Sequence, residues 1–146
     1  MGKAKSTIWR SAAVPAVVLV LAGCAHTVAK PAPEVQRYGS VIGLNADKVE
    51  EYKKLHANAW PGVLDMITQC NIRNYSIYLV ELKEGEYYLF SYFEYVGDDF
   101  EADMAKMAED PTTQEWWTHC EPCQQPIPLR AEGEWWANME EVFHHD

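Results

Sequence analysis

Four stretches of the chain carry the pattern of β-strands. Residues 37–44, 72–81 and 87–96 are rich in β-branched and aromatic side chains, and residues 134–143 alternate between two faces. The connection between the second and third stretch contains Gly85, which supplies the positive φ of a tight hairpin. We therefore predict four strands, of which the middle two form a hairpin.

Helical spacing marks the segments between these strands. Residues 48–59 read as an amphipathic helix that ends before Pro61, because proline cannot continue a helix without losing a backbone hydrogen bond. A second helical segment follows Pro61, residues 100–109 form another helix, and Pro111 starts a further helical turn. The proline-rich stretch 122–128 is predicted to be a loop.

The order strand, helix, strand, strand, helix, strand is that of an α+β, ferredoxin-like (split βαβ) domain. Such a domain has helices on one face of an antiparallel sheet. Residues 87–96 are apolar on both faces, so the other face of the sheet needs a cover as well. A second copy of the same sheet is the simplest cover, and we predict a homodimer that forms a dimeric α/β barrel.

The N-terminus has the features of an export signal. A basic start precedes the apolar run 11–21, which is shorter than the roughly 20 residues that span a bilayer. The residues Leu21-Ala22-Gly23-Cys24 resemble the bacterial lipobox. We therefore predict a lipoprotein signal peptide over residues 1–23, lipidation of Cys24, and an exported, membrane-anchored protein outside the cytoplasm. The alternative is an ordinary cleaved signal with Cys24 unmodified.

Residues 24–36 contain two prolines and no large apolar side chain, which predicts a flexible tether. Residues 37–146 then form the single folded domain. The formal net charge of −10 argues against nucleic acid and against an anionic membrane surface as partners. The sequence also lacks a glycine-rich phosphate loop, a nucleophile elbow and a His-Glu-x-x-His motif, which excludes the common nucleotide, serine hydrolase and metalloprotease classes.

Cys120 and Cys123 form a Cys-x-x-Cys pair. The second half of a zinc site is missing, and the pair does not open a helix after a strand, as it does in thioredoxin-like proteins. The two residues can be loop thiols or a structural disulfide, they can pack as neutral side chains, or they can serve catalysis or a metal. We favour the first of these interpretations and predict no metal site.

The six tryptophans and eight tyrosines are an excess that favours a sugar ligand, because flat rings stack on the C–H faces of sugars. Trp116 and Trp117 are adjacent and point in different directions, so at least one of them is expected to face a cavity or a partner. Trp135 and Phe143 share one face of the stretch 134–143, and we expect both to belong to the core.

His56 is the candidate for acid–base chemistry. Tyr52, His56 and Trp60 recur at i, i+4 and i+8, which places a group that titrates near neutral pH between two aromatic rings on one helical stripe. A lone histidine is more often structural, but this context favours function. The other four are weaker candidates, since they lie in the tether, the tail or a predicted loop: His26, His119, His144 and His145.

Several motifs, in this order, resemble the L-rhamnose mutarotase family over about residues 37–146. They are Tyr-x-x-x-His-x-x-x-Trp-Pro at 52–61, Asn-Tyr-Ser-Ile-Tyr at 74–78, Trp116-Trp117, and the ending Met-Glu-Glu-Val-Phe-His at 139–144. The resemblance implies a homodimeric barrel that interconverts the anomers of a free monosaccharide, a 6-deoxy sugar such as L-rhamnose, without a cofactor. It also implies that His56 is the proton donor, and that Tyr52, Tyr75, Trp116 and Trp117 contact the sugar.

Two other functions share these features. A sugar-binding lipoprotein without catalysis has the same aromatic residues, and it would bind sugar but leave anomer exchange at the buffer rate. A cofactor-free monooxygenase can use the same dimeric barrel, but the Tyr-His-Trp-Pro constellation argues against it. Within the favoured function, L-fucose is a plausible substrate beside L-rhamnose.

Overall fold

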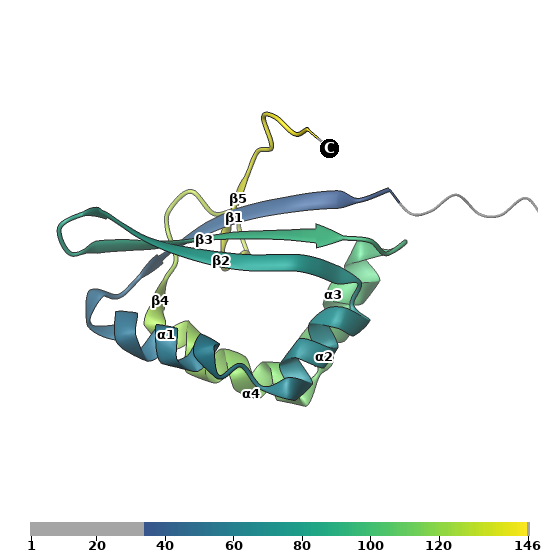
Figure 1. The fold of residues 1–146 in the computed structure, drawn as a ribbon, viewed down its shortest axis with the longest axis horizontal. Helices are drawn as coiled ribbons and strands as arrows, with labels where there is room; N and C mark the ends of the chain where they lie inside the picture. The colour runs from purple at the N-terminus through teal and green to yellow at the C-terminus, as the bar shows by residue number, and fades with distance from the viewer. Residues whose placement is uncertain (1–33, 146) are drawn as a thin grey trace, which may run out of the picture. The chain divides into compact units, whose positions relative to one another are not determined.

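The computed structural model describes residues 34–145, which contain one antiparallel sheet with helices on one of its faces (Figure 1). The strands run in the order β2-β3-β1-β4, and the short strand β5 also pairs with β1. Their bounds are β1 Gln36–Leu44, β2 Ile72–Lys83, β3 Glu86–Tyr95, β4 Gln124–Gln125 and β5 Ala137–Met139. This order is the ferredoxin-like arrangement and confirms the predicted fold class.

The helices lie together beneath the sheet (Figure 1). They are α1 Val49–Ala57, α2 Pro61–Gln69, α3 Phe100–Glu109 and α4 Pro111–Cys120, with the short 3₁₀ turns Ala46–Lys48 and Glu121–Cys123 beside α1 and after α4. The prolines at the start of α2 and α4 occupy the first helical position, where the missing N–H costs no hydrogen bond. The helix predicted over residues 48–59 ends two residues earlier, at Ala57, and the turn predicted at Pro111 is a full helix.

The β2–β3 hairpin agrees with the sequence pattern. The connection is short, and Gly85 has a φ of 78°, a region that side-chain-bearing residues rarely adopt. Gly43 serves a different purpose, because β4 approaches β1 closely there. A Cβ atom at Gly43 would lie 2.7 Å from the carbonyl oxygen of Gln125.

The strand predicted over residues 134–143 is mostly wrong. Only Ala137–Met139 pair with β1, and residues 140–145 have no strand assignment. The edge of β1 is instead shared between two short strands, because β4 pairs with Gly43 and Leu44 while β5 pairs with residues 39–41. Pro126 and Pro128 lack the N–H groups of a continuous ladder, so the chain leaves the sheet between the two strands.

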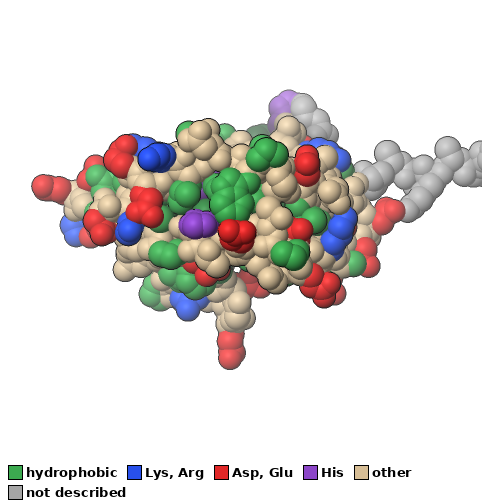
Figure 2. Space-filling model, turned by 90° about the horizontal axis from the view of Figure 1, so that it is seen from below, with side chains coloured by type: hydrophobic (Ala, Val, Ile, Leu, Met, Phe, Trp, Pro, Cys, Tyr) green, Lys and Arg blue, Asp and Glu red, His purple; other side chains and the backbone are tan. Residues whose placement is uncertain are grey.

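The core lies between the sheet and the helices. Ile42 and Leu44 of β1 and Leu89 of β3 meet Val49 and Tyr52 of α1 there. Figure 2 views the helical layer from outside and shows that apolar side chains gather near the middle of this face, with acidic side chains scattered around them. The outer face of the helical layer is therefore not uniformly polar.

Candidate active site

A cavity of about 210 Å³ opens between the helical layer and the sheet. Its walls come from α1, β2, α4, β4 and the segment before β5. All five residues that the sequence assigns to a sugar site line this cavity: Tyr52, His56, Tyr75, Trp116 and Trp117. Residues more than sixty positions apart in the chain thus meet in one place, as a binding site requires.

His56 lies one helical turn after Tyr52, and their rings stack with centroids 4.1 Å apart. Its Nδ1 lies 3.1 Å from the backbone oxygen of Tyr52. A carbonyl oxygen can only accept, so this hydrogen bond requires the proton on Nδ1 and leaves Nε2 as the acceptor of the neutral ring. Burial lowers the pKa of His56, and the bond to the Tyr52 carbonyl opposes part of that effect by raising it.

The second ring beside His56 is not the predicted one. Helix α1 has ended before Trp60, which has extended backbone and caps the start of α2. Trp60 instead contacts Trp116 and His119, with ring centroids 5.4 and 5.5 Å away. Trp116 takes the expected place of Trp60, edge-on to His56 at 5.4 Å.

The two tyrosines of the site keep their protons at neutral pH. Burial raises the pKa of Tyr52 far above its ordinary value, although a hydrogen bond from Gln124 opposes the shift. Although 43% of the Tyr75 surface is exposed, its side chain lines the cavity, and burial raises the pKa of Tyr75 to about 12. Both phenols are therefore available as hydrogen-bond donors to a ligand.

Helix α4 presents the tandem tryptophans. Trp116 is buried against the core, while Trp117 is partly exposed at the rim of the cavity. Asp110 caps the start of this helix, because its side chain accepts a hydrogen bond of 2.7 Å from the backbone N–H of Thr113. This cap fixes the start of the helix that carries both rings.

The structure adds residues that the sequence did not assign to the site. Gln124 of β4 donates to the Tyr52 hydroxyl over 3.4 Å and accepts from the indole N–H of Trp135 over 2.7 Å. Trp135 is 42% exposed and lines the cavity with Trp136, so the prediction that Trp135 belongs to the core is wrong. The signal that could have shown this is the adjacent pair itself, since both tryptophans of this pair line the cavity, as both do at 116–117.

Phe143 was also expected in the core, and that prediction is wrong as well. The residue is 81% exposed, because it follows the end of β5 and is left uncovered by the other residues within 34–145.

An apolar lobe of about 480 Å³ continues from the cavity toward α2 and α3. The two spaces share His56, Tyr75 and the tandem tryptophans. The residues that line only the lobe are mostly apolar, for example Ile67, Met104 and Met107, so the site combines one polar end with one apolar end.

Cys120 and Cys123 are free thiols, and both are buried at the junction of α4 and the following turn. Burial raises the pKa of both thiols, that of Cys120 to about 12. A protonated, buried thiol behaves as a small apolar side chain, which agrees with the packing interpretation in place of the favoured loop thiols or disulfide. Within residues 34–145 no group of three or more His, Cys, Asp or Glu side chains could hold a metal ion.

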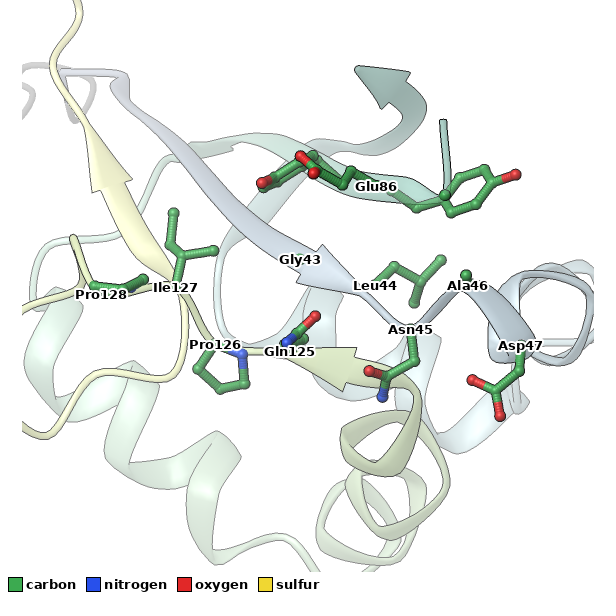
Figure 3. Close-up of a pocket in the computed structure, with 13 residues that line it drawn as sticks. Gly43, Leu44, Asn45, Ala46, Asp47, Glu86, Gln125, Pro126, Ile127 and Pro128 are labelled. Carbon is green, nitrogen blue, oxygen red and sulfur yellow. The ribbon is translucent and has the colours of Figure 1, made fainter. Parts of the chain in front are cut away.

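A second cavity, of about 310 Å³, lies where β1 ends beside the hairpin and the proline-rich loop (Figure 3). Asn45 and Asp47 point to one side of the end of β1, and Glu86 lies on the other (Figure 3). These polar groups do not converge, and the lining contains no histidine or tryptophan. The chemistry-bearing residues are therefore concentrated in the first cavity.

The first cavity combines a histidine that can exchange a proton, two phenol donors and flat indole rings. That set suits a small polyhydroxylated ring, whose C–H faces stack on aromatics and whose hydroxyls need hydrogen-bond partners.

Comparison with known proteins decides the family. Residues 37–145 match the family model described as L-rhamnose mutarotase. The chain belongs to the L-rhamnose mutarotase family. It is similar to the L-rhamnose mutarotase of Lactiplantibacillus plantarum (34% identical over 110 residues, 75% of this chain and 98% of the relative). It is also similar to that of Bacillus subtilis (33% over 118 residues, 77% and 100%).

The crystal structure of an L-rhamnose mutarotase from Formosa agariphila has the same fold, with a TM-score of 0.56 at 22% identity, over 76% of this chain and 99% of that one. The family membership confirms the prediction from the motifs, and with it the class of protein: an isomerase-type enzyme that acts on a carbohydrate. It also argues against the monooxygenase interpretation.

The predicted location, as an exported lipoprotein outside the cytoplasm, is wrong for this family. The Lactiplantibacillus and Bacillus relatives are aligned over 98% and 100% of their own length, so their chains leave no room for a comparable leader or lipid anchor. The leader 1–23 and Cys24, on which the prediction was based, lie outside the residues that the structure describes. No helix within residues 34–145 has the length and apolar character of a membrane span.

Proposed function

We propose that this protein interconverts the α and β anomers of L-rhamnose, or of a closely related 6-deoxy sugar, by acid–base ring opening without a cofactor. The observation that carries the proposal is the stacked His56 and Tyr52 pair, with the Nδ1 of His56 bound to a carbonyl, inside a cavity of sugar size. The relatives named L-rhamnose mutarotase support the choice of sugar.

His56 carries the proton in this proposal. Ring opening breaks the bond between the anomeric carbon and the ring oxygen, while the anomeric hydroxyl loses a proton and the ring oxygen gains one. Because burial lowers the pKa of His56, the neutral ring predominates at neutral pH. Its Nε2 takes the proton of the anomeric hydroxyl and, as the imidazolium, donates it to the ring oxygen.

One nitrogen can serve both oxygens, because both are bonded to the same carbon. After the opened chain rotates about the bond next to the aldehyde, the same transfers run in reverse on the other face and close the second anomer. The histidine ends as it began, so no cofactor and no net proton are needed. General acid–base help of this kind typically contributes about 10²–10⁴-fold.

The remaining residues hold the sugar. Tyr52 and Tyr75 donate hydrogen bonds to its hydroxyls, since burial keeps both phenols protonated. Trp116 and Trp117 offer ring surface to its C–H faces. The apolar lobe beyond them accepts the end of the sugar that lacks a hydroxyl.

The active form is a homodimer in this proposal. The face of the sheet turned away from the helices carries apolar side chains, among them Tyr78, which is 63% exposed, and Leu82. The residues on either side of Tyr78 in the strand, Ile77 and Leu79, point to the opposite face and pack on the core. An apolar sheet face of this kind is covered when two copies pack back to back.

Anomer-exchange NMR on free L-rhamnose tests the catalytic proposal. We expect the wild type to exceed the buffer rate, and His56→Asn to lose about 10²–10⁴-fold in kcat/KM, because the variant lacks the proton carrier. His119→Asn is the matched control, since His119 also lies edge-on to a tryptophan but does not line the cavity. It should retain wild-type exchange.

Sugar binding, followed by calorimetry, separates catalysis from binding alone. Binding without accelerated exchange in the wild type would identify a non-catalytic sugar-binding protein. Exchange that is unchanged in His56→Asn would remove His56 from the mechanism while leaving the mutarotase activity in place.

A further inference from the structure

The strand β2 is irregular at the point where it supplies Tyr75 to the site. Arg73 pairs with Glu94 of β3, but the next pair is Ser76 with Tyr92. Asn74 and Tyr75 of β2 therefore lie opposite a single residue of β3, Phe93. This is a β-bulge, which inserts one extra residue into one strand of a pair.

The bulge decides which side of the sheet Tyr75 faces. Side chains alternate along a strand, so a shift of one residue moves each side chain to the other face. In a regular ladder Tyr75 would stand opposite Tyr92, on the face turned away from the helices. With the bulge, Ser76 takes that place, and Tyr75 lies on the helix side, 5.7 Å from the ring of Phe93. Tyr75 lines the cavity for this reason.

Asn74 has the backbone conformation that the bulge requires. Its φ is 49°, in the left-handed region that L residues avoid and that asparagine tolerates better than most. Its side chain is also anchored, because Nδ2 donates to Oε2 of Glu94 over 2.6 Å. The other carboxylate oxygen of Glu94 accepts from the hydroxyl of Tyr92 over 2.9 Å, so Glu94 is fixed from two sides.

We propose that Asn74 and Glu94 are positioning residues for the sugar site, which hold the bulge of β2 so that Tyr75 faces the cavity. Asn74 contributes in two ways, through its tolerance of a positive φ and through its hydrogen bond to the neighbouring strand. Glu94 lies on the opposite side of the sheet from the cavity, so it acts on the site only through the bulge. The functional part of this inference rests on the proposed sugar site; the placement of Tyr75 does not.

Two variants separate the contributions of Asn74. Asn74→Gly keeps the positive φ accessible but removes the anchor, and Asn74→Ala removes the anchor and strains the backbone. We expect kcat/KM for L-rhamnose to fall about three- to tenfold in Asn74→Ala, mainly through KM, and less in Asn74→Gly. Glu94→Ala should resemble Asn74→Gly, and Glu94→Gln should restore much of the activity because its amide can still bond both partners.

The chain provides a matched control in Asn71. This residue also has a positive φ, 57°, and its Nδ2 donates to Asp103 over 2.8 Å, but it lies at the turn before β2 and does not line the cavity. Asn71→Ala should lower stability to a similar degree and leave kcat/KM unchanged.

A double-mutant cycle with Tyr75→Phe tests whether Asn74 acts through the Tyr75 hydroxyl. Residues that act through one another are non-additive. We expect Asn74→Ala to cost less than twofold in the Tyr75→Phe background. Fully additive losses, or an Asn74→Ala variant that loses stability alone, would overturn the proposal.

A measurement of Tyr75 itself keeps the placement testable if the protein proves inactive. With ¹³C-labelled tyrosine, and Tyr75→Phe to assign the signal, the Tyr75 phenol of the wild type should remain largely protonated at pH 10.5. In folded Asn74→Ala it should ionise at lower pH, because it has moved toward water. An unchanged Tyr75 signal would overturn the proposal, whereas absent exchange in the wild type would overturn only the mutarotase function.

Discussion

The two nitrogens of His56 have different surroundings, and this difference gives the residue its proposed chemistry. Nδ1 is bound to the carbonyl of Tyr52, one turn earlier in α1. The remaining nitrogen is the one that a substrate can use. Stacking on Tyr52 and the edge of Trp116 remove water from the ring, and this burial lowers the pKa of His56. A ring that rests neutral can begin the reaction by accepting a proton.

The pH dependence of exchange follows from this shift. We expect kcat/KM to be level between pH 7 and 9 and to fall on the acid side, with a midpoint below the ordinary histidine pKa of about 6.5. The raised pKa of Tyr75 keeps that phenol protonated across the range. Anomer-exchange rates, corrected for the buffer reaction at each pH, give the profile. A midpoint above 6.5 would contradict the assignment, and His119→Asn should not move it.

The same group links stability to pH. The folded state holds His56 with a lowered pKa, so the unfolded chain binds more protons as the solution becomes acidic. The contribution of His56 to stability is therefore fully present above pH 6.5, and it is lost as the pH falls through 6.5 to the folded pKa and below. Enzyme activity and stability should weaken together on acidification.

At the scale of elements, each side chain of the site is fixed by a local feature of its own strand or helix. The turn spacing of α1 stacks Tyr52 on His56, the bulge of β2 turns Tyr75 inward, and the cap at Asp110 starts the helix of the two tryptophans. The strands β4 and β5 bring Gln124 and Trp135 together from both ends of a loop. The site is thus assembled from short, separately determined pieces.

The cap of α4 can be tested by itself. We expect Asp110→Ala to lower the free energy of unfolding by about 1 kcal/mol, because the N–H of Thr113 loses its partner at the start of the helix. Asp110→Asn, which still offers an oxygen in the same place, should lose much less. Urea denaturation of the three proteins measures the difference, and equal losses in both variants would show that charge or packing at Asp110 matters more than the cap.

At the scale of the whole molecule, the two faces of the sheet have different roles. One face and the helices enclose the cavity, and the other presents Tyr78 and Leu82 to solvent in the single chain. A domain of this size rarely leaves such a face uncovered. The predicted back-to-back dimer accounts for it without a second kind of protein.

Dimer formation predicts a specific response to a charge on that face. Tyr78→Glu should convert a wild-type dimer into a monomer, because one carboxylate from each copy would be buried in the proposed interface. Leu64→Glu is the matched control, since Leu64 is also an exposed apolar residue but lies on α2, in the helical layer. Light scattering after size exclusion gives the masses. A monomeric wild type, or dissociation in both variants, would contradict the proposed interface.

The sequence alone determined the elements whose residues signal their own structure. The two central strands, the glycine hairpin and the proline-started helices follow from local propensity, and the motif spacing was enough to indicate the family. Only the tertiary structure decided which rings meet. It placed Trp116 beside His56 where the helical stripe predicted Trp60, and it moved Trp135 from the expected core to the cavity. These contacts depend on where α1 ends and on how β4 and β5 share the edge of β1, and both bring together segments that lie far apart in the sequence.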